Sequence, residues 1–329
     1  MTSQPLAAVT GAEGFIGSHL TEALVASGHR VRAMAQYNSF SSYGWLETLA
    51  PDVLDHVEIV LGDVRDPGSV RGLLDGADVA YHLAALIAIP YSYQAPHSYV
   101  ETNVIGTLNV LEAVRKLDIP RMVHTSTSET YGTARTVPIS EAHPLQAQSP
   151  YAASKAGGDK LAESYHASFE VPVVTLRPFN TFGPRQSARA FIPTIISQVA
   201  SGADEVKVGS LDPTRDFTYV KDTAAAFHLA GTTAGIEGEL FNAGVGGEIS
   251  MGVLAETIAA LMDRDVTFVP EQARQRPDKS EVMRLVCDST KFRAATGWQP
   301  AHSLEDGLRE TISWLTGNLD RYRPGVYAV

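Results

Sequence analysis

The sequence is short of cysteine and of basic residues. Cys287 is the only cysteine in 329 residues, so no disulfide can form within the chain, and we expect a reducing, cytoplasmic location. There are 37 acidic residues against 26 basic ones, and the net charge of -11 argues against nucleic acid or an anionic membrane surface as a partner. The 10 histidines show no metal-ligand spacing, and one thiol cannot complete a thiolate site, so we predict no metal.

Long hydrophobic runs are missing too. No apolar segment approaches the length needed to cross a bilayer. Residues 1–5 have neither the basic region nor the apolar stretch of a secretory signal, so we expect no membrane partner. Hydrophobic residues make up 44% of the chain and charged residues 19%, which is typical of a folded globular protein and argues against extended disorder.

What the sequence does contain is a regular alternation of short apolar segments and helical patterns. A helix is predicted at 18–27, and another places Val100 and the apolar residues that follow it, up to Val114, on one face. This alternation predicts an α/β fold with a Rossmann-like, doubly wound parallel sheet. The predicted strands are 6–10, 31–35, 57–60, 78–83, 121–125 and 171–176.

A glycine-rich turn follows the first predicted strand. Gly11, Gly14 and Gly17 stand between that strand and the helix at 18–27. In this context, backbone N–H groups and the helix N-terminus can hold a pyrophosphate. A plain strand–turn–helix connection would explain the glycines if they stood alone, but their position after a strand favours a dinucleotide site.

The end of the second predicted strand discriminates between nicotinamide cofactors. NAD binders usually place Asp or Glu there and NADP binders place Arg, but residues 33–38 contain neither an acid nor a basic cluster. Because the extra phosphate of NADP would be poorly compensated, we favour NAD, with Gln36 or Asn38 on the ribose; Arg32 leaves NADP open. The pair Asp63-Val64 follows the third strand and is predicted to meet the adenine, a turn cap being the alternative for the aspartate.

The pattern changes after Arg177, where proline and glycine interrupt the chain often. We predict a nucleotide-binding domain at 1–176, to which segments near 214–243 return. Most of 177–329 is predicted to form a smaller, mixed α/β substrate-binding lobe. No internal repeat or low-complexity linker is found, so we expect the two parts to share one continuous interface.

Tyr151 and Lys155 are four residues apart in a predicted helix and so share one face. A lysine ammonium beside a phenol favours the phenolate, which can act as a base near neutral pH. Segment 126–129 ends the fifth predicted strand at the carboxyl edge of the sheet, where ligands of such folds bind. An exposed Tyr–Lys pair and a group of capping residues are the structural alternatives, and the glycine turn disfavours them.

With these residues in place, the chain resembles the extended short-chain dehydrogenases/reductases, and among them the nucleotide-sugar epimerases and dehydratases. The resemblance covers essentially the whole chain and implies NAD as cofactor and a nucleotide sugar as substrate. The matching motifs are Thr10–Gly17, Asp63-Val64, His82–Ala85, Asn103, Ser126–Gly132, Tyr151–Lys155, Arg177–Asn180, Gly183–Arg185 and Arg215–Phe217. The further cofactor residues that the resemblance implies are Phe15, Ile16, Leu83, Ala84, Ala85, Thr125, Tyr151, Lys155 and Pro178.

The segment Thr127-Ser128-Glu129 bears on the reaction. Many 4-epimerases have small residues where the glutamate stands, whereas sugar 4,6-dehydratases often have Thr-Asp-Glu or Thr-Ser-Glu, and UDP-glucuronate decarboxylases share the second form. Segments 85–93, 179–190 and 279–284 resemble the UDP-N-acetylglucosamine 4,6-dehydratases of legionaminic-acid pathways. The resemblance therefore favours a lyase of this kind.

The resemblance also implies a role for each catalytic residue. Tyr151 takes the proton of the sugar 4-hydroxyl, while Lys155 lowers the pKa of the tyrosine and binds the cofactor ribose. Thr127 bonds O4 as it becomes a carbonyl. The ketone acidifies C5, from which Glu129 removes the hydrogen. Ser128 assists departure of the 6-hydroxyl at a position where commoner dehydratases carry Asp, and a 4-keto-6-deoxy sugar results.

The resemblance also implies which residues bind the substrate, and most of them are arginines. Asn180, Arg215 and Arg276 occupy positions that bind the diphosphate or nucleoside in relatives. Arg185 is a further candidate. Arginine forks suit phosphate geometry, although a surface ion pair is the alternative for any one of them.

A loop and two helices complete the expectations. Pro90, Tyr91 and Tyr93 follow the strand end near His82 and are predicted to line the sugar pocket, an aromatic core cluster being the alternative for either tyrosine. The helices that begin near Val100 and Tyr151 resemble the pair that forms a four-helix bundle in dimers of this family. We therefore expect a homodimer.

Other functions stay open at this point. A UDP-sugar 4-epimerase needs no base at C5, so Glu129 counts against it. A UDP-glucuronate decarboxylase needs a cation for the C6 carboxylate, which Arg185 or Arg189 could supply. A 5,6-elimination would use the same residues. A non-catalytic dinucleotide-binding regulator belongs to another class of protein, and the intact Tyr151 and Lys155 argue against it.

Overall fold

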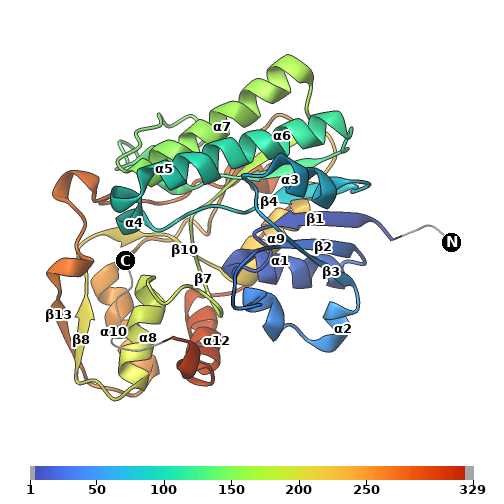
Figure 1. Cartoon of the computed structure of the whole chain (residues 1–329). Coiled ribbons are helices and arrows are strands. Elements are labelled where there is room, and N and C mark those ends of the chain that lie inside the picture. The colour runs from blue at the N-terminus through green and yellow to red at the C-terminus, as the bar shows by residue number, and fades with distance from the viewer. Residues whose placement is uncertain (1–3, 323–329) are drawn as a thin grey trace.

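A seven-stranded parallel sheet forms the centre of the computed structural model, which describes residues 4–322. The strand order is β11-β6-β5-β4-β1-β2-β3, and helices cover both faces (Figure 1). The predicted Rossmann-like α/β fold is confirmed. The strands are β1 Leu6–Thr10, β2 Arg30–Gln36, β3 Val57–Gly62, β4 Val79–His82, β5 Met122–Thr125, β6 Val173–Pro178 and β11 Leu240–Ala243.

Two layers of helices bury the two faces of this sheet. Strand β1 shows the arrangement, because Ala7 and Val9 belong to the core cluster on one face and Ala8 to the cluster on the other. Alternate side chains of a strand point to opposite faces, so a strand covered on both sides is apolar throughout. The helices on the first face are α1 Phe15–Ala26 and α9 Val220–Thr232, and those on the second are α3 Pro67–Leu74, α6 Gly106–Lys116 and α7 Pro150–Phe169.

The chain that leads into α6 departs from the prediction. A short helix, α5 (Pro96–Tyr99), is followed by a π-helical turn at Val100–Ile105. The wider turn changes the side-chain register, so Val100 is 50% exposed whereas Leu111 is fully buried. The prediction of one apolar face from Val100 to Val114 was therefore wrong at its first residue.

A smaller lobe follows β6 and lies at the lower left of Figure 1. Its elements are β7 Asn180–Phe182 paired with β10 Phe217–Tyr219, β9 Thr214–Arg215 with β12 Ile249–Ser250, β8 Glu205–Val208 with β13 Thr267–Pro270, and the helices α8 Phe191–Ala200, α10 Met251–Leu261 and α12 Leu304–Thr316. Ile195, Leu254 and Leu308, one from each helix, are fully buried in its core. Between these elements the chain crosses back, so that α9 packs on the large sheet and β11 joins it as an edge strand beside β6.

Short helices connect the larger elements. They are η1 Gly44–Thr48, α2 Pro51–Leu54, α4 Ile89–Gln94, η3 Ser128–Tyr131, η4 Gln272–Arg274, η5 Asp278–Ser280, α11 Thr290–Thr296 and η6 Leu319–Arg321.

Within the part of the chain that is described, no helix is long and apolar enough to span a membrane.

Candidate active site

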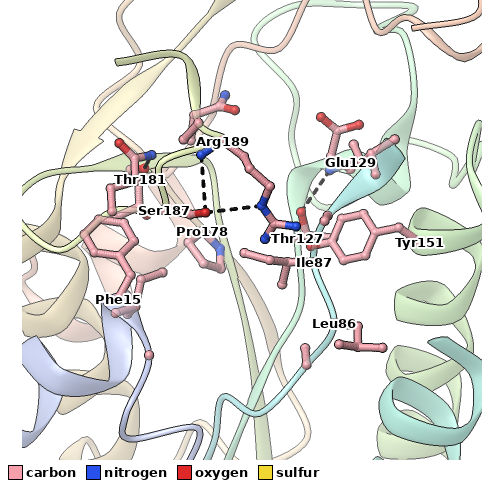
Figure 2. Close-up of a pocket in the computed structure, with 18 of the residues that line it drawn as sticks. Phe15, Leu86, Ile87, Thr127, Glu129, Tyr151, Pro178, Thr181, Ser187 and Arg189 are labelled. Carbon is pink, nitrogen blue, oxygen red and sulfur yellow. Dashed lines mark hydrogen bonds between the residues drawn. The ribbon is translucent and has the colours of Figure 1, made fainter. Parts of the chain in front are cut away.

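A cavity of about 660 Å³ lies at the carboxyl edge of the parallel sheet and extends to the smaller lobe. Figure 2 shows its central part, where Thr127, Glu129 and Tyr151 face Ser187 and Arg189 of the lobe. The predicted site residues that line it are Gly11, Gly14, Phe15, Ile16, Gly17, Gln36, Asp63, Val64, Leu83, Ala84, Ala85, Pro90, Tyr91, Thr125, Thr127, Ser128, Glu129, Tyr151, Lys155, Pro178, Asn180, Arg215 and Arg276.

The glycine turn has the shape that a dinucleotide site requires. Gly11 has a φ of +68°, and a Cβ on it would stand 2.7 Å from the backbone nitrogen of Ala84. A Cβ on Gly17 would stand 2.1 Å from the Gly11 carbonyl oxygen. Helix α1 begins at Phe15, three residues earlier than the predicted start at Ser18. Its N-cap is Gly14, which has no side chain to cap the first N–H groups of the helix. The first N–H groups of the helix can thus donate to an anion, which fits a pyrophosphate.

Asn38, Tyr93 and Arg185 lie outside this cavity, contrary to the prediction. The Tyr93 hydroxyl forms a hydrogen bond with the Ser280 hydroxyl. The Asn38 amide donates to the carbonyls of Gln36 at 3.2 Å and Ser42 at 2.8 Å, and so closes its own turn. The Arg185 guanidinium donates to both carboxylate oxygens of Glu22 on α1, at 2.8 and 3.0 Å. This partly buried ion pair joins the smaller lobe to the sheet domain instead of facing a ligand.

Tyr151 and Lys155 are buried on the first turns of α7. The Lys155 ammonium donates to the Thr125 carbonyl on β5 at 2.6 Å. Burial lowers the pKa of Lys155 to about 8, against the opposing charge of Asp159. Burial raises the pKa of Tyr151, which the hydrogen bond to Thr127 partly counteracts. The sequence led us to expect a lowered pKa for this phenol; in the structure desolvation outweighs the favourable contacts.

Glu129 reaches the cavity from η3, directly after β5. Thr127 is the N-cap of that helix, and its Oγ1 accepts the Glu129 N–H at 3.3 Å (Figure 2). The Glu129 side chain is 13% exposed, and its Oε1 lies 3.5 Å from Nη1 of Arg276. Ser128, which lies between Thr127 and Glu129 in the sequence, is buried. A carboxylate, a hydroxyl and the phenol of Tyr151 thus gather on one side of the cavity, where they can transfer more than one proton.

A buried ionic network lies behind the lysine, and sequence reasoning missed it. Asp159 on α7 accepts hydrogen bonds from Arg177 at 2.7 Å and from Ser126 at 2.6 Å. Its other oxygen bonds the His124 ring at 3.1 Å. All four side chains are almost fully buried, and together they tie α7 to β5 and β6. The spacing could have revealed the network, because an acid eight residues after Tyr151 lies on the same helix face.

Two guanidinium groups of the smaller lobe line the cavity beside Glu129. Arg215 is 6% exposed and donates to Glu281 at 3.2 Å, while Arg276 lies 3.9 Å from the same carboxylate. The amide of Asn180 donates to the Asp216 carbonyl at 3.4 Å. Two of the predicted cations, Arg215 and Arg276, are therefore assembled in one place, and Glu281, which the sequence did not single out, contacts both.

Aromatic residues form the wall around the phenol. Pro90 and Tyr91 line the cavity from α4. The Tyr91 ring packs against Tyr99, which in turn meets Tyr151 edge-on, with ring centroids 6.2 and 6.3 Å apart. Tyr91 therefore belongs both to the cavity wall and to an aromatic cluster. Within residues 4–322, no group of three or more His, Cys, Asp or Glu side chains is placed to hold a metal ion.

Comparison with known proteins identifies the family to which this site belongs. The model of the GDP-mannose 4,6 dehydratase family matches residues 8–311. The chain belongs to this family. It is thus an extended short-chain dehydrogenase/reductase of the nucleotide-sugar dehydratase and epimerase group, as its motifs predicted.

Relatives of this family member carry two reaction names. The dTDP-glucose 4,6-dehydratase of Actinoplanes sp. is 34% identical over 319 residues, covering 94% of this chain and 97% of the relative. The UDP-glucose 4-epimerase of Mycolicibacterium smegmatis is also 34% identical, over 315 residues, covering 93% and 97%. The crystal structure of DesIV, a dTDP-glucose 4,6-dehydratase of Streptomyces venezuelae with NAD bound, has a TM-score of 0.85 and 30% identity, covering 97% and 99%. Overall sequence identity to these relatives does not distinguish dehydration from epimerisation, so the distinction has to come from the residues that line the cavity.

Proposed function

We propose that this family member is an NAD-dependent nucleotide-sugar 4,6-dehydratase that acts on UDP-N-acetylglucosamine. The observation that carries the proposal is Glu129, whose carboxylate enters the same part of the cavity as Thr127 and Tyr151 (Figure 2). Oxidation at C4 needs one base, so a second proton acceptor beside it supports a further proton transfer, at C5. The choice of sugar rests on the sequences of 85–93 and 179–190, parts of which line the cavity.

The cofactor end of the cavity supports NAD, which DesIV also binds. The turn at 11–17 would hold the pyrophosphate on the N-terminus of α1, the pair Asp63-Val64 would meet the adenine, and Lys155 would bond the nicotinamide ribose. When bound, NAD supplies the acceptor for a hydride from C4 and the donor of a hydride to C6. The surrounding side chains handle the protons.

The first proton leaves the sugar 4-hydroxyl. Tyr151 Oη accepts it, and Thr127 Oγ1 donates to O4 as that oxygen becomes a carbonyl. Since burial raises the pKa of Tyr151, the phenolate needs a nearby positive charge. Lys155 supplies it from one turn further along α7, while its bond to the Thr125 carbonyl fixes the ammonium in place.

The second proton leaves C5, which the C4 ketone acidifies. The Glu129 carboxylate accepts this proton, and Ser128, or a water that it holds, assists departure of the 6-hydroxyl. Arg276 lies 3.5 Å from the carboxylate. A substrate diphosphate that competes for this arginine would free Glu129 for its role as a base.

A UDP-glucuronate decarboxylase is the second candidate, and Arg189 favours it. Figure 2 shows this side chain extending from the smaller lobe toward Thr127, and its Nε donates to the Ser187 hydroxyl at 3.3 Å. A guanidinium there could bind the C6 carboxylate of a glucuronate. Decarboxylation of a 4-keto sugar needs no base at C5, but these decarboxylases share Thr-Ser-Glu, so the preference for the dehydratase rests on segments 85–93 and 179–190.

The reaction is tested by incubating the protein with UDP-N-acetylglucosamine in deuterated water and analysing the product by mass spectrometry and NMR. Loss of one water with deuterium at C5 is expected, and Tyr151→Phe should abolish it. An unchanged mass with an inverted C4 would replace the proposal with an epimerase. Release of carbon dioxide from UDP-glucuronate, without reaction of UDP-N-acetylglucosamine, would support the decarboxylase.

A further inference from the structure

We propose that Glu13, within the glycine turn, takes the place of the acid that β2 lacks: its carboxylate binds the hydroxyls of the adenosine ribose and makes the site selective for NAD over NADP. The inference rests on the proposed function only in that a nicotinamide dinucleotide must bind. It does not depend on the sugar or on the reaction. The ribose contact is assigned to a side chain of the glycine turn, whereas the sequence pattern predicted it at the end of the second strand.

The Glu13 carboxylate lies where β2 ends. Its Oε1 accepts the backbone N–H of Gln36, the last residue of that strand, at 3.1 Å. The other oxygen, Oε2, is shielded from solvent and has no hydrogen-bond partner within residues 4–322. Both residues line the cavity. The carboxylate is therefore anchored through one oxygen, while the other is unpartnered but covered. It accepts a hydrogen bond from a ligand once the side chain turns toward the cavity that Glu13 lines.

The loop that follows β2 holds Glu13 in this position. The Trp45 N–H donates to the Glu13 carbonyl at 3.0 Å. Gly44 has a φ of +59°, and a Cβ on it would stand 2.7 Å from that carbonyl and 3.1 Å from the Glu13 Cβ. The neighbouring Ala12 N–H donates to the Met34 carbonyl of β2 at 3.3 Å. With its backbone fixed on both sides, the side chain is directed along the strand end.

The chemistry of the free oxygen discriminates between the two cofactors. A carboxylate accepts hydrogen bonds from a vicinal diol, and hydrogen bonds to charged groups are the stronger ones. A 2′-phosphate offers no donor and brings further negative charge into a partly buried site, where repulsion is screened little. Burial already raises the pKa of Glu13, while two backbone N–H groups act in the opposite direction; a ribose hydroxyl would add a further favourable contact to the charged form.

The two nearby arginines have other partners and do not offset this charge. Arg32, which left NADP open on sequence grounds, donates through Nε to Glu58 at 3.0 Å and through Nη1 to the Asp75 carbonyl at 2.8 Å. Arg65 pairs with Asp63 at 2.6 Å. Selectivity for NAD thus follows from a fixed anion at the ribose and from basic groups that are engaged elsewhere.

The test compares NAD and NADP binding to the cofactor-stripped chain by calorimetry. In Glu13→Gln, which keeps the shape and removes the charge, we expect NAD affinity to fall about tenfold and the NAD-to-NADP preference to fall at least as much. Glu47→Gln is the matched control, because its carboxylate also accepts a backbone N–H, from Tyr43 at 2.6 Å, and lies outside the set that lines the cavity. The control should keep both affinities.

A second comparison uses 2′-deoxy-NAD. The parent protein should bind it about tenfold more weakly than NAD, whereas the Glu13→Gln variant should show a smaller loss, because its amide oxygen still accepts the 2′-hydroxyl but without the charge that strengthens the bond. Parental NAD binding with an unchanged preference in Glu13→Gln would overturn the assignment of Glu13 alone. If the parent bound neither dinucleotide, the proposed cofactor and this inference would both fall. Thermal unfolding of each variant checks that it folds.

Discussion

The proposed cofactor end and the proposed substrate end of the cavity are lined by different kinds of structural element. At the cofactor end, the lining comes from a turn and from strand ends, and the charges behind it, such as Asp159 and Arg177, are paired 2.7 Å apart and sealed in the core. At the substrate end, Arg215 projects from strand β9 and Arg276 from a loop of the smaller lobe, and they meet Glu281 at 3.2 and 3.9 Å. The first end is formed before a ligand arrives, whereas under the proposed function the second exchanges its ion pairs for a diphosphate.

This difference assigns separate tasks to the two ends. Rigid elements hold the phenol and the lysine, to which we assign the first proton transfer, and this suits a step that needs close alignment. Charged side chains with carboxylate partners suit recognition, because a phosphate can displace a carboxylate of the same charge sign. Changes at the cofactor end should therefore affect chemistry and stability, and changes at the substrate end should affect affinity.

The largest effect is expected for Tyr151→Phe. Loss of the base should lower kcat by about a hundred- to ten-thousandfold, while affinities for NAD and for the nucleotide sugar stay near those of the parent. Tyr99→Phe is the matched control, because it keeps the ring that packs on Tyr151 and loses only a bond to the Ala88 carbonyl. Steady-state kinetics and calorimetry measure the two quantities. A large loss of affinity in Tyr151→Phe would break the separation of tasks.

Asp159→Asn should destabilise the fold strongly. It leaves the buried Arg177 without its charged partner, which costs about 3–5 kcal/mol. Lys160→Gln, on the same helix, is the control, because Lys160 pairs at the surface with Glu163, and such pairs contribute little. Urea unfolding measures both. A free energy of unfolding for Asp159→Asn equal to that of the control would contradict the role of this network as the rigid support.

Lys155 should impose a pH dependence on stability. Its folded pKa of about 8 lies below the value of about 10.4 for an unfolded chain, so between these pH values the unfolded state binds more protons and stability rises with pH. The contribution is on the order of 3 kcal/mol, and it vanishes in Lys155→Met. Unfolding by urea at several pH values from about 7 to about 10.5 checks this. Equal slopes for parent and variant would show that the lysine is not desolvated.

Arg276→Gln should weaken substrate binding without affecting the cofactor. Loss of a charged hydrogen bond to the diphosphate is worth about 1.5–3 kcal/mol, so KM for the nucleotide sugar should rise roughly ten- to a hundredfold. Arg284→Gln is the control, because Arg284 pairs with the surface residue Glu248 at 2.6 Å. If Arg276→Gln also weakened NAD binding, the two ends would not be independent.

The two ends also differ in how well the sequence predicts them. The glycine turn and the Tyr151–Lys155 pair are local patterns, since strand, turn and helix periodicity decide where these residues lie. The prediction for Arg185 was wrong because its partner, Glu22, is distant in the sequence. The prediction for Asn38 was wrong because its amide donates hydrogen bonds within its own turn. The position of Glu281 between two arginines depends on how the loops of the smaller lobe fold together, which no local pattern contains.

The central claim is that Glu129 takes the C5 proton after the hydride step. The most direct test is Glu129→Gln, mixed with the nucleotide sugar that the parent dehydrates, with the absorbance of reduced nicotinamide and loss of water followed together. The account predicts that the variant still oxidises C4, so reduced cofactor accumulates on the protein while water loss falls by about a hundredfold or more. Water loss at the parental rate would contradict it.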